Sequence, residues 1–236
     1  MESYREFLDR ISSFEKKELT LGDGDFSVSP SVALKVDRDN SFRRFYGDTV
    51  VFALDDSVKE HLARHVDRLY RAAPKCFCQR LVPQTFHVTL HDLSNSPNLC
   101  DVAEEVFRNE LEMLERRDEL RRLLSARIRV KGNYVFNMVG TSLVLGVYPA
   151  SEADYERLMQ LYSLVDGVKQ LSYPLTPHVT LAYYNVDGFD AKSARALEKE
   201  VNRINAEKGI EFELGKLYYQ KFVSMNDYID VIDLTE

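Results

Sequence analysis

The sequence predicts an α+β fold built around an internal repeat, and three observations support this prediction. A short phrase occurs twice: residues 83–90 read PQTFHVTL and residues 174–181 read PLTPHVTL, with six of the eight positions identical. Each copy ends a stretch that runs strand, helix and strand, so a whole supersecondary unit is duplicated. Helices and strands alternate without the regular crossover rhythm of a parallel sheet, which favours α+β over α/β.

The first 40 residues are predicted to form a helical extension that packs on a single domain, residues 41–236. Apolar residues at helical spacing predict an amphipathic helix at 2–16. Glycine and aspartate residues at 22–25 interrupt that pattern, and an extended piece is predicted at 32–36.

The two repeat halves cover about residues 45–95 and 133–185. A buried strand is predicted at 47–54 in the first half and at 140–147 in the second, each followed by a helix and then by a histidine strand. The offset between the halves is 93 residues at the first glycines (140 − 47) and 91 residues at the histidines (178 − 87). The register of the repeat therefore changes by only two residues.

The remaining elements connect or follow the two halves. Apolar residues every three to four positions indicate helices, and short apolar runs bounded by Gly or Asn indicate strands. The predicted elements are a charged helix at 101–124, strands at 126–130 and 133–139 around a turn at 131–133, a helix at about 190–207, strands at about 210–218 and 220–224, and an apolar tail.

Composition and charge limit the classes of protein to which the chain can belong. Apolar residues make up 44% and charged residues 29%, as in ordinary globular proteins. No apolar run approaches the ~18 residues of a membrane span, and the N-terminus carries no apolar signal region. We therefore expect a cytoplasmic protein that binds no membrane. The formal net charge of −7 disfavours DNA and long RNA as partners, and the arginines between Arg116 and Lys131 are interpreted as a solvated helix face.

Neither the cysteines nor a pair of histidines predicts a metal site. Cys76, Cys78 and Cys100 are odd in number and have no zinc-ligand spacing, so we interpret them as structural thiols. His61 and His65 lie four residues apart on a predicted helix, a spacing that can bind zinc, but no Glu-x-x-His signature accompanies them. We expect a solvated helix face here, and neither a metal nor a cofactor.

The duplicated phrase places an imidazole and a hydroxyl on one face of each histidine strand. Successive side chains of a strand point to opposite faces, so His87 and Thr89 share one face, as do His178 and Thr180. The apolar residues between and after them are predicted to face the core. His91 would share the face of His87 in a regular strand, but its repeat partner is an alanine, and we interpret it as a surface histidine.

Two imidazoles and two hydroxyls in one cleft can divide the work of phosphoryl transfer. Histidine changes charge near neutral pH, so one imidazole can withdraw a proton from the nucleophile while the other protonates the leaving oxygen. The threonine hydroxyls can donate to the non-bridging oxygens of the phosphate, and this scheme needs no metal ligands. Five aromatic residues near the predicted mouth of the cleft could also stack a base: Tyr46, Tyr134, Phe136, Tyr184 and Phe222. Aromatic residues at strand spacing usually belong to the core, so none of the five is proposed as a site residue.

The HVTL motifs at 87–90 and 178–181 resemble the paired H-x-T/S motifs of the 2H phosphoesterase superfamily. That group includes 2′,3′-cyclic phosphodiesterases and enzymes named 2′-5′ RNA ligases. The resemblance covers roughly residues 45–225 and implies a bilobal, LigT-like fold with a pseudo-two-fold repeat. In such a fold, two mainly antiparallel sheets line a central cleft and the helices lie outside. The resemblance also implies that the two histidines are catalytic and that Thr89 and Thr180 bind the phosphate.

Tyr183 matches an aromatic residue that some members carry five positions after the second histidine, where it helps to hold the substrate. Strict alternation would turn Tyr183 away from the groove, so this assignment requires a strand end or a bulge. The equivalent position after the first motif is Asp92.

The resemblance implies a phosphoric diester hydrolase, similar to the cyclic nucleotide phosphodiesterases of the group. It would hydrolyse a cyclic or 2′-5′ phosphodiester of a small nucleotide or RNA terminus without a metal, as a monomer. Three alternatives remain open at this point. They are a non-catalytic nucleotide-binding module on the same fold, RNA 2′-5′ ligase-type end processing, and a metal-dependent hydrolase using His61 and His65.

Overall fold

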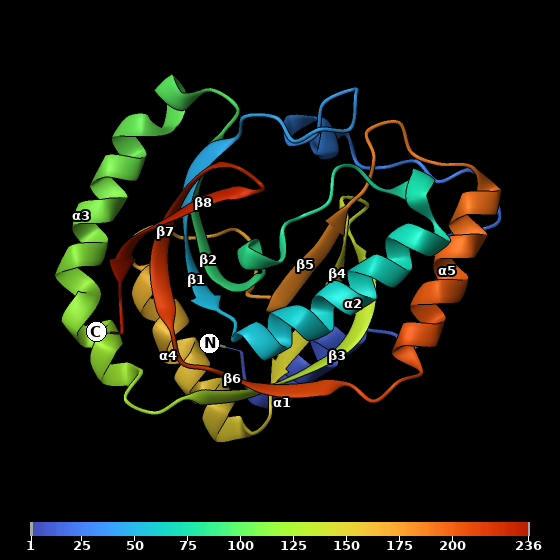
Figure 1. Ribbon diagram of the computed structural model, residues 1–236. Coiled ribbons are helices and arrows are strands. Elements are labelled where there is room, and N and C mark those ends of the chain that lie inside the picture. Colours follow the sequence, from blue (N-terminus) through green and yellow to red (C-terminus); the bar gives the residue numbers. More distant parts are fainter. Residues whose placement is uncertain (1, 236) are drawn as a thin grey trace.

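Two four-stranded antiparallel sheets form the centre of the molecule (Figure 1). The structure, a computed structural model, describes residues 2–235. The first residue of the predicted extension, Met1, and the last residue of the predicted domain, Glu236, lie outside the described part. The first sheet has the order β2-β1-β7-β8 and consists of β1 (Tyr46–Ala53), β2 (His87–Ser96), β7 (Leu217–Ser224) and β8 (Asp227–Asp233). The second has the order β5-β4-β3-β6 and consists of β3 (Ile128–Met138), β4 (Ser142–Pro149), β5 (His178–Tyr183) and β6 (Ile210–Leu214).

The two histidine strands lie at the edges where the sheets meet. β2 is the edge strand of the first sheet, β5 is the edge strand of the second, and the two strands contact each other. The predicted alternation is confirmed on both strands, because Val88, Leu90, Val179 and Leu181 are all buried. The repeat therefore brings its two polar faces toward one another across the junction of the sheets.

The C-terminal strands complete both sheets. β6 pairs with β3 of the second sheet, whereas β7 pairs with β1 of the first sheet and carries β8 at the outer edge. A chain segment of fewer than 30 residues thus adds one strand to the second half and two to the first.

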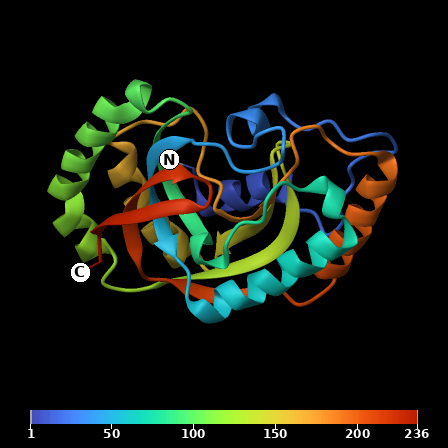
Figure 2. The same ribbon diagram turned by 45° about the horizontal axis from the view of Figure 1, so that its top comes forward.

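Within the described residues, five α-helices surround the sheets (Figures 1 and 2). They are α1 (Tyr4–Ser12), α2 (Asp56–Ala72), α3 (Leu99–Leu123), α4 (Glu152–Asp166) and α5 (Ala191–Asn205). α3 packs against β1, β2 and α4 on one side, and α2 packs against α5 on the other. Side chains that accept from the first-turn amides begin four of these helices, as expected for Ser, Asn and Asp caps: Ser3, Asn98, Ser151 and Asp190. Among residues 2–235, no helix is long and apolar enough to cross a membrane.

Two local predictions are wrong. The sequence predicts an extended piece at 32–36, but the first three residues of this piece belong to a 3-10 helix, η1 (Pro30–Leu34). This helix forms because Pro30 occupies its first turn and the Ser29 side chain caps it. The predicted turn at 131–133 lies inside β3, which continues through a bulge next to Gly132. A Cβ atom at Gly132 would lie 2.8 Å from the Leu145 side chain, so this glycine permits close packing of β3 on β4.

Candidate active site

Both H-x-T motifs line one cavity of about 710 Å³ at the junction of the two sheets. His87 is the first residue of β2 and His178 is the first residue of β5, so both imidazoles occupy the same position in their repeat halves. The side chains of Thr89 and Thr180 line the same cavity. The four predicted residues are therefore brought together in one space.

The two histidines are anchored in the same way. His87 Nδ1 lies 2.7 Å from the carbonyl oxygen of Thr85, and His178 Nδ1 lies 2.8 Å from the carbonyl oxygen of Thr176. A carbonyl oxygen can only accept, so in each imidazole Nδ1 carries the hydrogen and Nε2 is left as the atom that can take up or release a proton. The anchoring threonine is itself an identical position of the repeated octapeptide.

Burial keeps both imidazoles neutral in the free cavity. It lowers the pKa of His87 to about 4, against the opposing effects of its bond to Thr85 and the charge of Asp92. Burial also lowers the pKa of His178, and the positive charge of Lys35 lowers it further, while the Thr176 bond and Asp92 raise it. A bound anion between the rings would favour their protonated forms and raise these pKa values. Binding of an anionic ligand can therefore promote uptake of a proton from solvent by one imidazole, as an acid–base pair requires.

The hydroxyl groups of Thr89 and Thr180 are available to a ligand. Both side chains are half-buried and line the cavity, and neither hydroxyl makes a hydrogen bond to the part of the chain that the structure describes. Each can donate one hydrogen bond.

A bulge places Tyr183 on the cavity side of β5. Val144 pairs with Thr180 and Leu143 with Ala182, so the intervening residue of β5 has no partner and the alternation shifts. Tyr183 consequently shares the face of Thr180 and lines the cavity, where its hydroxyl donates to Met225 Sδ at 3.2 Å. The condition on which the Tyr183 assignment depends is thus met; its role in binding stays a prediction.

A bulge of the same kind occurs in β2, where Val51 pairs with Thr89 and Val50 with His91, and it turns the His91 imidazole toward α4 at the wall of the cavity. The interpretation of His91 as a surface histidine is wrong, because the residue is buried. Its imidazole is buried, with Nε2 at 3.1 Å from Asp166 Oδ1 on α4 and Nδ1 at 2.6 Å from the carbonyl oxygen of Asp92.

Asp92 is a cavity residue that the sequence reasoning did not propose. It lies 91 residues before Tyr183 (183 − 92), and the bulge in β2 turns it toward the cavity as the bulge in β5 turns Tyr183. Tyr173 donates to Asp92 Oδ2 at 3.3 Å. The negative charge of Asp92 favours the protonated forms of His87 and His178. The repeat itself matches Asp92 to Tyr183, but a carboxylate at that position does not suggest the counterpart of an aromatic ring.

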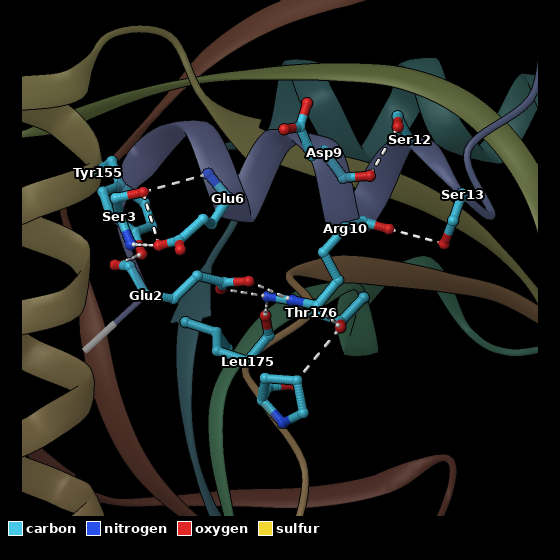
Figure 3. A network of polar contacts seen from close by, with 11 residues as sticks. Glu2, Ser3, Glu6, Asp9, Arg10, Ser12, Ser13, Tyr155, Leu175 and Thr176 are labelled. Carbon is cyan, nitrogen blue, oxygen red and sulfur yellow. Dashed lines mark hydrogen bonds and ion pairs between the residues drawn. The ribbon is translucent and has the colours of Figure 1, made fainter.

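The N-terminal extension also reaches the cavity. Arg10, Phe14 and Lys35 line it. The Arg10 guanidinium, held by Glu2, donates to the Leu175 carbonyl oxygen at 2.8 Å and to Thr176 Oγ1 at 3.1 Å (Figure 3). Because the Thr176 carbonyl oxygen accepts from His178, α1 supports the backbone segment that orients the second imidazole.

The other histidines and the cysteines lie elsewhere. His61 Nε2 and His65 Nε2 are 3.0 Å apart, and His65 is buried, so the prediction of a fully solvated helix face is wrong for His65. No group of three or more His, Cys, Asp or Glu side chains suited to a metal ion occurs within residues 2–235. Burial raises the pKa of Cys76 and Cys78 to about 12 each, which agrees with a structural role for these two thiols.

Comparison with known proteins identifies the fold. Neither a protein-family profile nor a curated protein sequence matches this chain. Solved structures do. ATU0111 of Agrobacterium tumefaciens, described as a conserved protein of unknown function, superposes with a TM-score of 0.64 at 13% identity, over 88% of this chain and 94% of that one. E. coli LigT complexed with 3′-AMP has a TM-score of 0.50 at 11% identity, over 80% of this chain and 97% of LigT.

This chain has a LigT-like fold. The predicted α+β architecture of two antiparallel sheets with outer helices is confirmed, and with it the resemblance to 2H phosphoesterases at the level of the fold. At 11% identity, roles of individual residues within the LigT-like fold rest on the geometry of this cavity.

Proposed function

We propose that this protein is a metal-independent phosphodiesterase of the 2H superfamily that hydrolyses a cyclic or 2′-5′ phosphodiester of a small nucleotide or an RNA terminus. The observation that supports this function most strongly is the pair of Nδ1-anchored imidazoles, His87 and His178, in one cavity with two free threonine hydroxyls. In each imidazole Nδ1 is bound to a backbone carbonyl oxygen, so the same nitrogen, Nε2, is left to exchange a proton with the substrate. Two such nitrogens, one on each side of a bound phosphate, would suit in-line displacement at phosphorus, in which the attacking and leaving oxygens lie opposite each other.

In the proposed reaction, water attacks the phosphorus atom while Nε2 of one histidine takes a proton from it. The bond between phosphorus and the leaving ribose oxygen breaks on the opposite side, and Nε2–H of the other histidine protonates that oxygen. Thr89 and Thr180 donate to the non-bridging oxygens and hold the phosphate in line. The product is a phosphomonoester when the substrate is cyclic, and the two imidazoles exchange protonation states in each turnover.

A nucleotide is the substrate class that best suits the cavity. Its volume of about 710 Å³ lies in the usual range of small-molecule sites. Aromatic rings that could stack a base line it: Phe45, Phe136, Tyr173, Phe222 and Tyr228. The ring of Tyr228 lies edge-to-face with His87 at a centroid distance of 5.1 Å. E. coli LigT, which shares the fold, was solved with 3′-AMP.

A nucleotide-binding module without catalysis is the second candidate. The observation in its favour is that burial lowers the pKa values of both histidines, so that neither imidazole is protonated near neutral pH before a ligand binds. Such a module would bind nucleoside monophosphates and leave every phosphodiester intact.

The test is a panel of 2′,3′-cyclic nucleotides, an ADP-ribose cyclic phosphate and 2′-5′-linked dinucleotides, incubated with EDTA. The wild type is expected to hydrolyse at least one of them, with a bell-shaped dependence of rate on pH. His87→Ala and His178→Ala should each lower turnover by on the order of 10²–10⁴. His61→Ala, which lies outside the cavity, is the matched control and should keep wild-type activity. Full activity in either cavity mutant would end the proposal.

A further inference from the structure

We propose that Lys35, contributed by the N-terminal extension, binds the anionic phosphate of the substrate in this cavity. The inference deepens the proposed function, on which it rests, by adding a substrate-contacting residue that lies outside both repeated motifs. It also assigns a binding role to a segment that precedes the repeat.

The backbone around Lys35 is held firmly. Lys35 ends η1, where its amide donates to the Val32 carbonyl oxygen at 2.9 Å and its own carbonyl oxygen accepts from Arg43 at the same distance. Val32 and Val36, on either side, are each only 1% exposed. The side chain therefore projects into the cavity from a fixed point, and little conformational freedom of the backbone would be lost when a ligand binds.

Two aromatic rings position the ammonium group. Lys35 Nζ lies 5.4 Å from the ring centroid of Phe45 and 5.3 Å from that of Tyr183. Such cation–π contacts orient a charge without neutralising it. Tyr183 is the residue that the β5 bulge turns toward the cavity, so the ring that orients Lys35 lies on the face of Thr180. The ammonium and the phosphate-binding hydroxyl are thus on the same side of the sheet.

The ammonium group of Lys35 is not paired with a carboxylate of the described residues and can therefore bind an anionic ligand. Within residues 2–235 it makes no ion pair with a carboxylate. The other cation of the extension that lines the cavity, Arg10, is different, because Glu2 binds its guanidinium through two contacts of 2.7 and 2.9 Å. Lys35 is close enough to His178 for its charge to lower the pKa of that imidazole.

An ammonium group in this position favours a ligand that carries negatively charged phosphate oxygens. The chain carries a net charge of −7, which repels a nucleotide at long range, and a local cation beside the acid–base pair offsets that repulsion. Phosphate oxygens are suitable partners, since charge-assisted hydrogen bonds are stronger than neutral ones.

The experiment measures binding of 3′-AMP and of inorganic phosphate by calorimetry to the full chain. Lys35→Met keeps an apolar stem against the two rings and removes the charge, and it should weaken both affinities by about 10- to 100-fold. The salt dependence of binding should also become shallower. Lys35→Arg should bind within about 5-fold of the wild type, because it restores the charge. Lys16→Met, an exposed lysine of the same extension, is the matched control.

A second readout separates ligand binding from a structural role. In Lys35→Met the pKa of His178, followed by NMR of the imidazole, should rise because a neighbouring positive charge is gone. Affinities of Lys35→Met within twofold of the wild type would overturn the inference and leave the proposed function standing. A wild type that binds neither 3′-AMP nor phosphate would overturn both.

Discussion

Acid should destabilise this protein through the desolvated, half-buried imidazole of His87, and His87→Asn tests that effect. Burial lowers the pKa of His87 to about 4 in the folded chain, whereas an unfolded histidine titrates near 6.5. Above pH 6.5 both states are neutral at this residue and its contribution to stability is fully present. As the pH falls from 6.5 toward 4, the unfolded state takes up a proton that the folded state does not, so stability is lost.

The size of the effect follows from the shift. One pKa unit corresponds to about 1.4 kcal/mol, so the imidazole alone should remove about 3 kcal/mol from the free energy of unfolding between pH 7 and pH 4. Asparagine retains a donor where Nδ1 bonds the Thr85 carbonyl oxygen and has no proton to take up in this range. His87→Asn should therefore lose about 3 kcal/mol less than the wild type on acidification.

Urea denaturation at pH 7, 5.5 and 4 measures this difference. Thr89→Val is the control, because it alters the same cavity without changing a titratable group and should shift stability equally at every pH. If the wild type and His87→Asn differ by the same free energy at pH 7 and at pH 4, the reasoning about the desolvated imidazole is refuted.

Substitutions at three further positions test the site and the packing of the second sheet. Arg10→Met should lower the free energy of unfolding in urea by about 1–3 kcal/mol and should lower kcat more than it changes KM, because the segment before His178 loses two charge-assisted hydrogen bonds. Arg10→Lys should restore part of the kcat. An unchanged kcat in Arg10→Met would contradict a positioning role. Gly132→Ala should cost about 1–3 kcal/mol, because its Cβ would meet Leu145 at 2.8 Å; a thermal midpoint equal to the wild type would show that β3 relaxes freely. Tyr183→Ala should weaken 3′-AMP binding in calorimetry by on the order of 10-fold, whereas Tyr183→Phe should not, and equal affinities in both would remove Tyr183 from the site.

The site pairs could be predicted because strand alternation has a simple period. His87 and Thr89 must share a face over a span of three residues, and the second copy repeats that requirement at His178 and Thr180. An octapeptide that keeps both its polar and its apolar face was enough to predict which four side chains meet in one cavity, while their roles stay a prediction. The fold class followed from the same repeat.

The parts that the sequence did not reveal depend on contacts between distant residues. Unpaired residues in each histidine strand change the side-chain direction beyond them, so that Tyr183 enters the cavity and the His91 imidazole turns toward Asp166 at the cavity wall. No residue type announces a bulge at these positions. Lys35 reaches the site only because the extension folds over the second half of the chain. Gly132 resembled a turn glycine, although what it provides is space for a side chain of β4.

The placement of the last three strands has a consequence for how the duplicated unit can be used. Because β6 serves one sheet and β7 with β8 serves the other, cutting the chain after α5 would strip a partner from β1 and from β3 at once. Neither copy could then be excised as an autonomous module, and each would present an unprotected strand edge to its neighbours in solution. The junction that carries the candidate site is thus held together by strands β6 to β8, which lie more than 100 residues after His87 in the sequence.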